Sequence, residues 1–525
     1  MRRSVQGAFD APDDGIVITG RLIDLHGWVY PPAAVDRVEI TVDDGAPHPA
    51  RLSAEPRWDI RDHFADPAGL LSGWWHLLDL GDRAEGDTVA VHADAIRSGR
   101  RVHLGTKRIR LGPVTPPDGP EQRWARALAD RDETARRPVP HGPDLRLLVV
   151  THSLTLGGAQ RWLHEVLRRV LDEPSTTCVV VAPAYGPYVE QLEDLGATVH
   201  LTGPYPSSAA TYESRVRELA QLATDRCCNV VLANTLGCTI AVDAASRAGL
   251  PAVLAVHEHF LLDEHCFAIH GREVDPHIRA RTQHALDVAS TVVFVCDATR
   301  EHLHAGPDER FVTIGSGIDL EAVDRERQRH DRDALRSRLG CARGDDVLLC
   351  VATVEPRKSQ AMLVLALARL ARDHPRAQLV LVGADDTPYS TALADLAAGL
   401  GLGARVRLVA ATADVGPWYA AADAFVLASD IESLPLSVME AMAFDLPSVV
   451  ADTGGVADLV DDGVTGILCP SRDLAALTSA LRRLLELPAG RRRAMGAAAA
   501  TRARGLDADR YAASVGRLLH DLVDA

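Results

Sequence analysis

The sequence predicts a multidomain protein in which an all-β sandwich is followed by two doubly wound α/β domains. Short alternating apolar segments, separated by Gly, Pro and Asp, fill residues 1–113, and this pattern is typical of β-strands. Two series of apolar strands alternating with helical segments begin at Asp144 and Asp345, and such alternation predicts parallel sheets covered by helices. A chain of 525 residues is long enough for about three domains.

Composition narrows the class of protein. With 47% hydrophobic and 24% charged residues, the chain can bury a sizeable core. A net charge of −16 argues against sequence-independent binding to nucleic acid and against a general affinity for anionic membranes. The nine cysteines are scattered without a C-x-x-C motif, which favours reduced thiols. Neither a secretory signal nor a run of membrane-spanning length is evident, so we expect a cytoplasmic protein.

The β domain is predicted from alternation alone. No helical period is evident in it, and about seven strands in this length favour a sandwich. Six of the strands are predicted at 16–20, 37–43, 48–53, 73–80, 88–93 and 101–111.

Four of the seven tryptophans of the chain fall in this domain, at Trp28, Trp58, Trp74 and Trp75. They suggest a sugar-stacking platform, although core and edge positions are the commoner role of tryptophan. Glycan binding, a contact in a homo-oligomer and packing on the rest of the chain all stay open as roles of the domain.

The remaining domain boundaries follow changes of pattern. A proline-rich linker is predicted at 114–144. Two Rossmann-like domains follow at 145–320 and 321–505, and a last helix occupies 506–525.

The stretch from Ser429 to Pro470 has the organisation of a ligand site. A polar loop with Glu432 follows an apolar strand, and Pro435 stands where a helix can begin. The helix expected at 436–444 carries Glu440. In α/β folds, anions bind where a strand ends and a helix begins, so we expect a ligand here.

This stretch resembles the retaining GT-B glycosyltransferases of the GT4 type. Their signature is E-x7-E, then G-G-x-x-E after a Pro-bounded strand, then V-x-x-G-x-L. Here it reads Glu432-x7-Glu440, then 454–458 with Asp458 in place of the last Glu, then 464–468. The resemblance implies an acceptor-binding N-terminal Rossmann-like domain and a nucleotide-sugar-binding C-terminal one. The active site would lie between them, and the last helix would cross back to the N-terminal domain.

The resemblance also implies roles for residues of this stretch. Glu440 would hold the ribose hydroxyls and Glu432 the hydroxyls of the transferred sugar. Backbone groups near the helix start would contact the diphosphate, at Ser433, Leu434, Pro435 and Leu436. The co-substrate would be a UDP- or GDP-sugar, with no cofactor and no metal.

Gly157 and Gly158 lie between an apolar strand and a helix. Glycine lets a ligand approach the backbone, and a helix N-terminus offers free N–H donors. The pair resembles the GG loop of the family's N-terminal domain. No G-x-G-x-x-G follows any strand, so a dinucleotide oxidoreductase lacks its fingerprint.

Lys358 is one of only two lysines in the chain, with Lys107. It follows a strand in the T-x-E-P-R-K form of the family's phosphate-binding motif, and we expect it to contact the donor diphosphate. Arg357 is a candidate for a second positive charge.

The motif also departs from the usual family pattern. Ala352 and Thr353 stand at the usual Gly and Arg places, and Ser359 replaces the final Gly. Whether Arg357 replaces the arginine missing at Thr353 stays open.

His257 ends a strand six residues after Pro251. It matches the family histidine that contacts the donor sugar near its 6-hydroxyl. The segment 257–284 contains six histidines, but their spacing fits no ordinary zinc pattern. We expect this segment to shape the acceptor pocket.

These features predict a retaining, metal-independent glycosyltransferase that moves a hexose to a glycan, a lipid-linked sugar or a natural product. Its catalytic residues would be Glu432, His257 and Lys358. The alternative is a non-catalytic carbohydrate-binding or scaffolding protein on a GT-B frame, which the departures at Ala352, Thr353 and Asp458 would support. A sugar-phosphate phosphorylase or synthase on the same fold is a third possibility.

Overall fold

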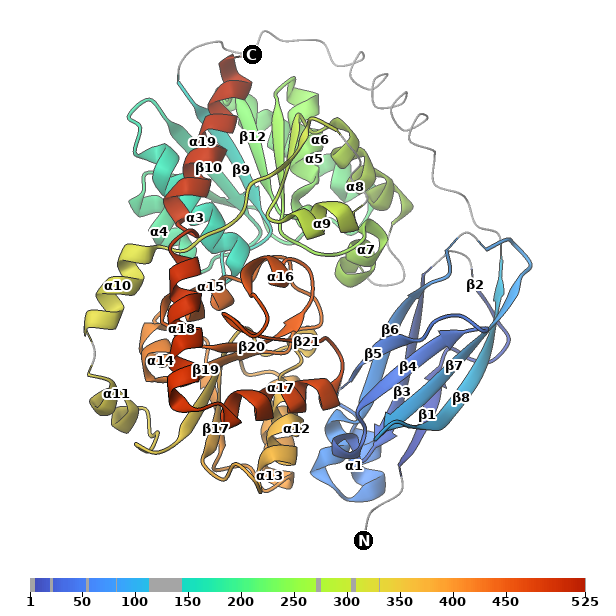
Figure 1. Ribbon diagram of the computed structural model, residues 1–525. Helices are drawn as coiled ribbons and strands as arrows, with labels where there is room; N and C mark the ends of the chain where they lie inside the picture. Colours follow the sequence, from blue (N-terminus) through green and yellow to red (C-terminus); the bar gives the residue numbers. More distant parts are fainter. Residues whose placement is uncertain are drawn as a thin grey trace. The chain divides into compact units, whose positions relative to one another are not determined.

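The computed structural model describes residues 5–18, 22–52, 56–81, 83–112, 144–270, 275–303, 308–329 and 331–524 (Figure 1). The predicted linker at 114–144 lies outside these residues except for Asp144. The chain divides into two compact units. Unit 1 comprises Met1–Pro116, Leu320–Glu432 and Ser437–Gly505, and unit 2 comprises Pro117–Asp319, Ser433–Leu436 and Leu506–Ala525.

The N-terminal region of unit 1 is β-rich, as predicted, although it also contains one short α-helix. Its eight strands have the order β1-β3-β6-β5-β4-β7-β8-β2. Strand β5 pairs with both β4 and β6, so the eight strands form one continuous sheet. Side chains from strands along this sheet form the hydrophobic core of the domain. The strands are β1 (Gln6–Ala11), β2 (Ile16–Ile18), β3 (Leu22–Tyr30), β4 (Arg37–Val42), β5 (His48–Leu52), β6 (Gly73–Asp79), β7 (Thr88–Arg97) and β8 (Arg100–Leu111).

Two strands and a helix of this domain were not predicted. Strand β3 contains Gly27, and a glycine inside a strand pattern usually indicates a bulge or a break. Here the strand needs glycine, because a Cβ at this position would lie 2.1 Å from the Ala8 carbonyl oxygen of the paired strand β1. Helix α1 (Trp58–Phe64) buries only Ile60 and therefore leaves no detectable period. The short 3-10 helices η1 (Pro32–Ala34) and η2 (Pro67–Leu71) complete the domain.

Three of the four tryptophans of this domain have clearly different environments. Trp74 is buried in the core, with its ring centroid 5.3 Å from that of Phe9. Trp75, the next residue on the strand, lies under the Arg51 guanidinium. Trp58 is exposed on α1. The core position of Trp74 excludes it from a sugar-stacking surface, so the prediction that all four tryptophans form such a platform is wrong.

Unit 2 contains the first Rossmann-like sheet, which is parallel with the order β11-β10-β9-β12-β13-β14-β15. Six of these strands confirm the predicted series, whereas β15 was not predicted as a strand. The strands are β9 (Arg146–Thr151), β10 (Thr177–Ala182), β11 (Thr198–Leu201), β12 (Val230–Asn234), β13 (Ala252–Val256), β14 (Thr291–Phe294) and β15 (Phe311–Thr313).

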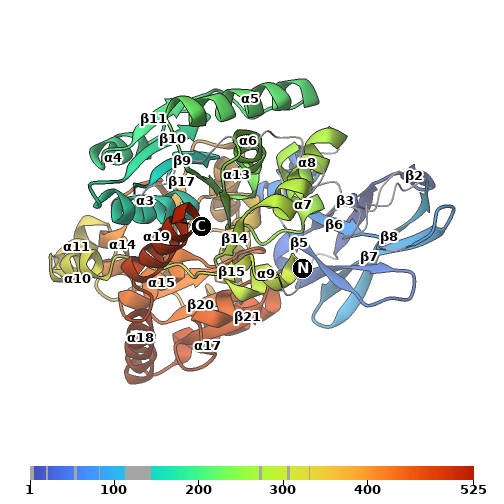
Figure 2. The ribbon, with the colours of Figure 1, turned by 90° about the horizontal axis from the view of Figure 1, so that it is seen from above.

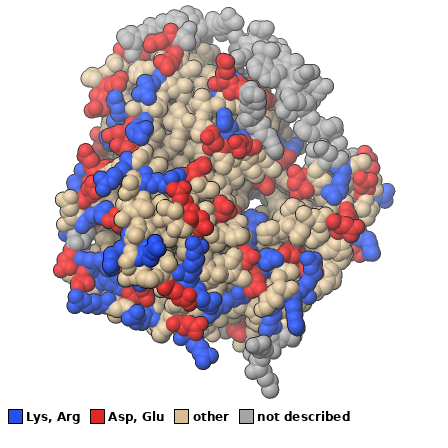
Figure 3. Space-filling view, viewed as in Figure 1, with Lys and Arg blue, Asp and Glu red and all other residues tan. Residues whose placement is uncertain are grey.

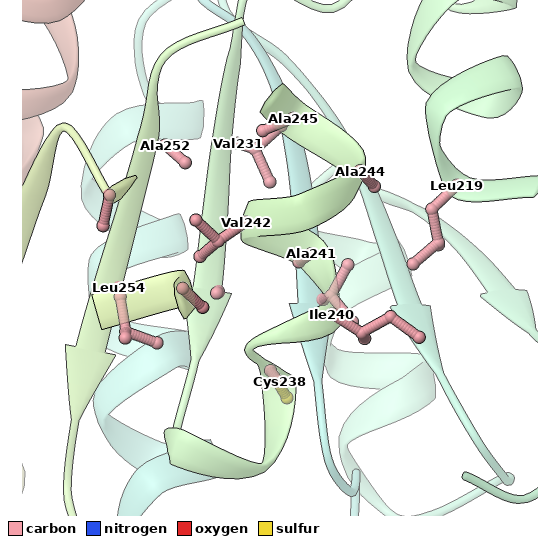
Figure 4. Close-up of a cluster of buried hydrophobic side chains, with 14 of the residues drawn as sticks. Leu219, Val231, Cys238, Ile240, Ala241, Val242, Ala244, Ala245, Ala252 and Leu254 are labelled. Carbon is pink, nitrogen blue, oxygen red and sulfur yellow. The ribbon is translucent and has the colours of Figure 1, made fainter. Parts of the chain in front are cut away.

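Helices cover both faces of this sheet (Figure 2). In β9, Leu148 faces one hydrophobic cluster and Leu147 the other, which explains why the strand sequence is continuously apolar. The helices of the first cluster are α5 (Ala209–Asp225), α6 (Ile240–Ala248) and α8 (Pro276–Val288), and Figure 4 shows Leu219, Ile240 and Val242 of this cluster with strand residues Val231 and Leu254.

The second face is covered by α3 (Gly158–Leu171), α4 (Tyr188–Asp194) and the C-terminal helix α19 (Ala508–Asp524). Helix α19 packs along α3 through Tyr511, Val515 and Leu519 (Figures 1 and 2). The last helix of the chain is thus part of unit 2, and the bridge between Ile318 and Asp507 pairs the segments that enter and leave this unit.

The second Rossmann-like sheet, in unit 1, has the order β18-β17-β16-β19-β20-β21. This is the doubly wound order 3-2-1-4-5-6, which creates a topological switch point beside the first strand. The strands are β16 (Asp346–Val351), β17 (Ala377–Ala384), β18 (Val406–Ala410), β19 (Ala424–Leu427), β20 (Ser448–Asp452) and β21 (Gly466–Pro470).

Helices alternate with the strands of this domain, as predicted. They are α10 (Leu320–Arg329), α11 (Arg332–Arg338), α12 (Gln360–Leu370), α13 (Pro388–Gly399), α14 (Gly416–Ala421), α15 (Leu436–Ala443), α16 (Val456–Leu459), α17 (Leu474–Glu486) and α18 (Ala489–Ala503). Within the described part of the chain, no helix combines the length and apolarity needed to cross a membrane. Acidic and basic side chains are interspersed on the face shown in Figure 3.

Within unit 1, the β domain contacts the α/β domain directly. The 3-10 helix η2 packs against α13, and η1 packs against α12. Arg369 of α12 donates to the carbonyl oxygens of Ala33 and Val35. The β domain is therefore docked on the outer helices of the second Rossmann-like sheet.

Candidate donor-binding site

The loop after β19 carries most of the predicted site. Its polar side chains are buried, at Ser429, Asp430, Glu432 and Ser433. The boundary between the two units falls after Glu432, and the chain returns to unit 1 at Ser437. The predicted donor-binding stretch is therefore divided between the two units.

In unit 1, Lys358 and Glu432 form a nearly buried ion pair. Lys358 ends the 3-10 helix η5 (Pro356–Lys358), which follows β16. Its Nζ donates to Oε1 of Glu432 at 2.5 Å, and the two side chains are 13% and 10% exposed. Burial acts to raise the pKa of Glu432, but the charges of Lys358 and Arg357 outweigh it and hold the pKa below its ordinary value. Glu432 is thus a carboxylate beside a fixed cation.

Arg357 has a carboxylate partner of its own. Its guanidinium contacts Glu355 at 2.7 Å and is 40% exposed. Its carbonyl accepts from the amide of Asp430 at 2.9 Å, which ties the two loops together. Whether Arg357 substitutes for the arginine missing at Thr353 stays a prediction.

Glu440 lies inside α15 and is buried. The hydroxyl of Tyr419, from α14, lies 2.7 Å from its Oε2 and 3.2 Å from the carbonyl oxygen of Ser437. The sequence did not single out Tyr419, because an aromatic residue in a helix usually indicates core packing. Tyr419 orients the Glu440 carboxylate.

Asp430 and Ser359 were also missed as functional partners. The Ser359 hydroxyl donates to Oδ1 of Asp430 at 2.6 Å, and the Asp430 side chain is completely buried. Ser359 has φ of +52°, a left-handed conformation that favours glycine. Serine in place of the family glycine therefore supplies a hydroxyl group, although this backbone conformation is unfavourable for serine.

In unit 2, Gly157 and Gly158 stand at the start of α3, where Gly157 is the N-cap residue. The φ of Gly157 is −175°, which any residue can adopt, so backbone conformation does not require glycine here. A Cβ on Gly157 would lie 2.4 Å from the Gln160 side chain, and one on Gly158 would lie 3.8 Å from Leu436. The role of this loop in phosphate binding stays a prediction.

His257 follows β13 in the same unit. Its Nε2 lies 2.9 Å from Oδ1 of Asn234, and its carbonyl oxygen accepts from the Ser433 hydroxyl at 2.6 Å. Burial and the proximity of His152 lower the pKa of His257 to about 3. The amide nitrogen of Asn234 donates to Thr151 and Ala159. Since the Asn234 oxygen faces the imidazole, the neutral ring carries its proton on Nε2 and Nδ1 is the acceptor.

Glu258 is a half-buried carboxyl that the sequence analysis did not single out. Its Oε2 accepts from the amides of Leu236 at 3.1 Å and His257 at 3.0 Å. Burial raises its pKa to about 7. Thr235, beside it, has φ of +100°, which is unusual for a β-branched residue. Strain of this kind clusters at functional sites.

Two further histidines of the segment 257–284 have partners of their own. His259 stacks on His302 with 4.3 Å between ring centroids, and His277 contacts Glu213 at 2.9 Å. Among the described residues, no group of three or more His, Cys, Asp or Glu side chains is arranged to hold a metal ion.

Two doubly wound Rossmann-like domains with buried carboxylates after β19 define the class of GT-B glycosyltransferases. Residues 156–322 match the family described as Glycosyltransferase Family 4, and residues 331–502 match the one described as Glycosyl transferases group 1. The chain belongs to the family 4 glycosyltransferases. The predicted family and fold are thereby confirmed.

Curated relatives are about one-third identical to the chain over the residues that match. A D-inositol 3-phosphate glycosyltransferase of Frankia alni is 33% identical over 51% of this chain and 67% of its own length. One of Kineococcus radiotolerans is 35% identical over 42% of this chain and 55% of its own. A GDP-mannose-dependent alpha-(1-6)-phosphatidylinositol monomannoside mannosyltransferase of Mycolicibacterium smegmatis is 31% identical over 44% of this chain and 62% of its own. The chain thus matches about half to two-thirds of the length of these proteins.

Solved structures agree on the fold. Anabaena HepE in complex with UDP-glucose is 23% identical, with a TM-score of 0.62, and the match covers 72% of this chain and all of that one. A sucrose-phosphate synthase from Thermosynechococcus elongatus is 18% identical with a TM-score of 0.60, over 72% of this chain and 99% of that one.

Proposed function

We propose that the protein is a retaining, metal-independent glycosyltransferase that moves a hexose from a UDP- or GDP-sugar to a hydroxyl group of an acceptor. The observation that carries the proposal is the buried Lys358–Glu432 pair, with Nζ 2.5 Å from Oε1, at the carboxyl end of β16. A fixed cation beside an ionised carboxylate suits a ligand that has both phosphate and hydroxyl groups.

The donor would be held by residues with complementary chemistry. Lys358 and Arg357 supply positive charge for the diphosphate, and the GG loop with the segment 433–436 supplies backbone contacts. Glu440, oriented by the Tyr419 hydroxyl at 2.7 Å, accepts hydrogen bonds from the ribose hydroxyls. Glu432 accepts from hydroxyls of the transferred sugar, since its lowered pKa keeps it ionised.

The reaction breaks the bond between the anomeric carbon and the diphosphate. Negative charge develops on the leaving diphosphate, where Lys358 and Arg357 stabilise it. The sugar passes through an oxocarbenium-like state. The leaving phosphate takes the proton of the acceptor hydroxyl, so no enzyme base is assigned. His257 is neutral and binds a sugar hydroxyl through Nδ1, without donating a proton to the reaction.

A polyol phosphate is the first acceptor to test. Several relatives act, by their names, on D-inositol 3-phosphate, and one is a GDP-mannose-dependent mannosyltransferase. The acceptor of this chain is otherwise proposed only as a carbohydrate or a small molecule that has hydroxyl groups.

The test is turnover of radiolabelled UDP- and GDP-sugars with and without D-inositol 3-phosphate and simple saccharides. We expect release of the nucleoside diphosphate to depend on an acceptor and to fall strongly in Lys358→Ala and Glu440→Ala. The product anomer, read by NMR, should match the donor. Absence of nucleotide-sugar binding, with no effect of Glu440→Ala, would favour the non-catalytic scaffold instead.

A further inference from the structure

We propose that the N-terminal β domain helps to form the donor site, and that its Arg51 positions the loop after β19. Through Asp430, Arg51 holds the loop that ends in Glu432. The expected effect of this loop on catalysis rests on the proposed donor-binding role of Glu432. The effect of Arg51 on the position of the loop does not rest on that role.

The contact between the two domains is an ion pair between residues far apart in the sequence. Nε of Arg51, on β5, donates to Oδ2 of Asp430. The Arg51 side chain is 12% exposed and that of Asp430 is 0% exposed. The guanidinium also lies 4.8 Å from the ring centroid of Trp75, on the neighbouring strand β6. Arg51 is thus held by its own domain while it reaches into the other one.

Asp430 depends on this contact because its charge is fully buried. Its carboxylate accepts from the Ser359 hydroxyl at 2.6 Å, and Arg472 approaches it to 3.7 Å. A buried carboxylate is tolerated only where cations and donors surround it. Arg51 is the nearer of these two arginines, and it comes from the β domain.

The position of Asp430 in the chain connects it with the proposed chemistry. Asp430 precedes Glu432 by two residues, and its partner Ser359 directly follows Lys358. Its amide donates to the carbonyl of Arg357, and its carbonyl accepts from the Thr453 hydroxyl. Both members of the Lys358–Glu432 pair therefore sit on segments that converge on Asp430. Displacing this carboxylate would move the pair.

The docking of the β domain does not depend on Arg51 alone. Arg369 contacts Asp36 at 2.9 Å, and the amide of Leu474 donates to the Asp36 carbonyl at 2.8 Å. Arg37 contacts Asp473 at 3.2 Å across the same interface. Arg37 therefore offers a matched control, an interdomain arginine–aspartate pair that does not touch the loop.

The test compares Arg51→Met with Arg37→Met in the full-length protein. Hydrogen exchange of the amides at 428–432 should be at least tenfold faster in Arg51→Met and within twofold of wild type in Arg37→Met. Exchange unchanged in Arg51→Met, or accelerated equally in both variants, would overturn the proposal. This readout needs no substrate.

Donor turnover gives the second measurement. Arg51→Met should lower kcat/KM for the nucleotide sugar at least tenfold, and Arg37→Met should change it less than twofold. The double variant Arg51→Met/Asp430→Asn should be no worse than the more impaired single variant, because Arg51 acts through Asp430. Additive losses contradict that route. If the wild type neither binds nor turns over any nucleotide sugar, the proposed function fails while loop exchange still decides the role of Arg51.

Discussion

Nζ of Lys358 lies 2.5 Å from Oε1 of Glu432, and this pair joins the two segments from which the sequence predicted a donor site. The lysine comes from the loop after β16 and the glutamate from the loop after β19, and these two strands are neighbours in the sheet. Parallel strands end at the same edge, so residues 74 positions apart meet.

Replacing Lys358 tests the cation of this pair. Lys358→Met should weaken binding of UDP or GDP about ten- to a hundredfold, since a charge-assisted contact contributes about 1.5–3 kcal/mol. Titration calorimetry measures it. Lys107→Met is the matched control, because Lys107 donates to the Asp10 carbonyl in the β domain. Equal affinities of both variants and the wild type would remove Lys358 from the donor site.

The hydroxyl of Tyr419 should stabilise the fold through Glu440. Tyr419→Phe deletes a buried hydrogen bond to a carboxylate and should lower the free energy of unfolding by about 1–3 kcal/mol. Tyr185→Phe deletes the equivalent contact with Glu190, at 2.9 Å, from a tyrosine that is 60% exposed. Denaturant titration should show almost no change in this control, and similar losses in both variants would contradict the prediction.

Ser359 combines an unfavourable conformation with a favourable hydrogen bond. Ser359→Gly relieves the left-handed backbone but loses the contact with Asp430, and we expect net destabilisation of about 1 kcal/mol. Ser359→Ala loses the contact without the relief and should be worse by about another 1 kcal/mol. Ser98→Gly, at an exposed position with φ of +48°, should instead stabilise the protein slightly. A stabilising Ser359→Gly would show that the hydroxyl contributes little.

Glu258 should make stability depend on pH. Burial raises its pKa from 4.5 to about 7, so the native state binds more protons than the unfolded state between these values. Stability from this group is therefore fully present below pH 4.5 and falls as pH rises towards about 7.

Glu258→Gln should abolish this fall, since the amide oxygen can still accept from Leu236 and His257. One pKa unit corresponds to about 1.4 kcal/mol, so at pH 8 the free energy of unfolding of the variant should exceed that of wild type by on the order of 3 kcal/mol. Parallel pH profiles of unfolding for the two proteins would show that Glu258 does not titrate as described.

Much of the fold, and several residues of the candidate donor site, could be predicted from the sequence because they depend on local patterns. Strands such as β9 and β16 are buried on both faces and therefore read as continuous apolar runs. The pair Glu432 and Glu440 was found through an ordered motif. The failures have local causes as well, since α1 buries one residue and β3 contains a glycine that a neighbouring strand requires.

The sequence by itself determined the order of strands and helices, the family, and the residues whose motif resembles the donor site of that family. Only the tertiary structure decided that Asp430 is completely buried and that Arg51, from the N-terminal β domain, is its partner. An ion pair across 379 positions leaves no periodicity or spacing in the sequence. It arises because two separately folded surfaces dock, and the burial that gives the pair its importance exists only after they have done so.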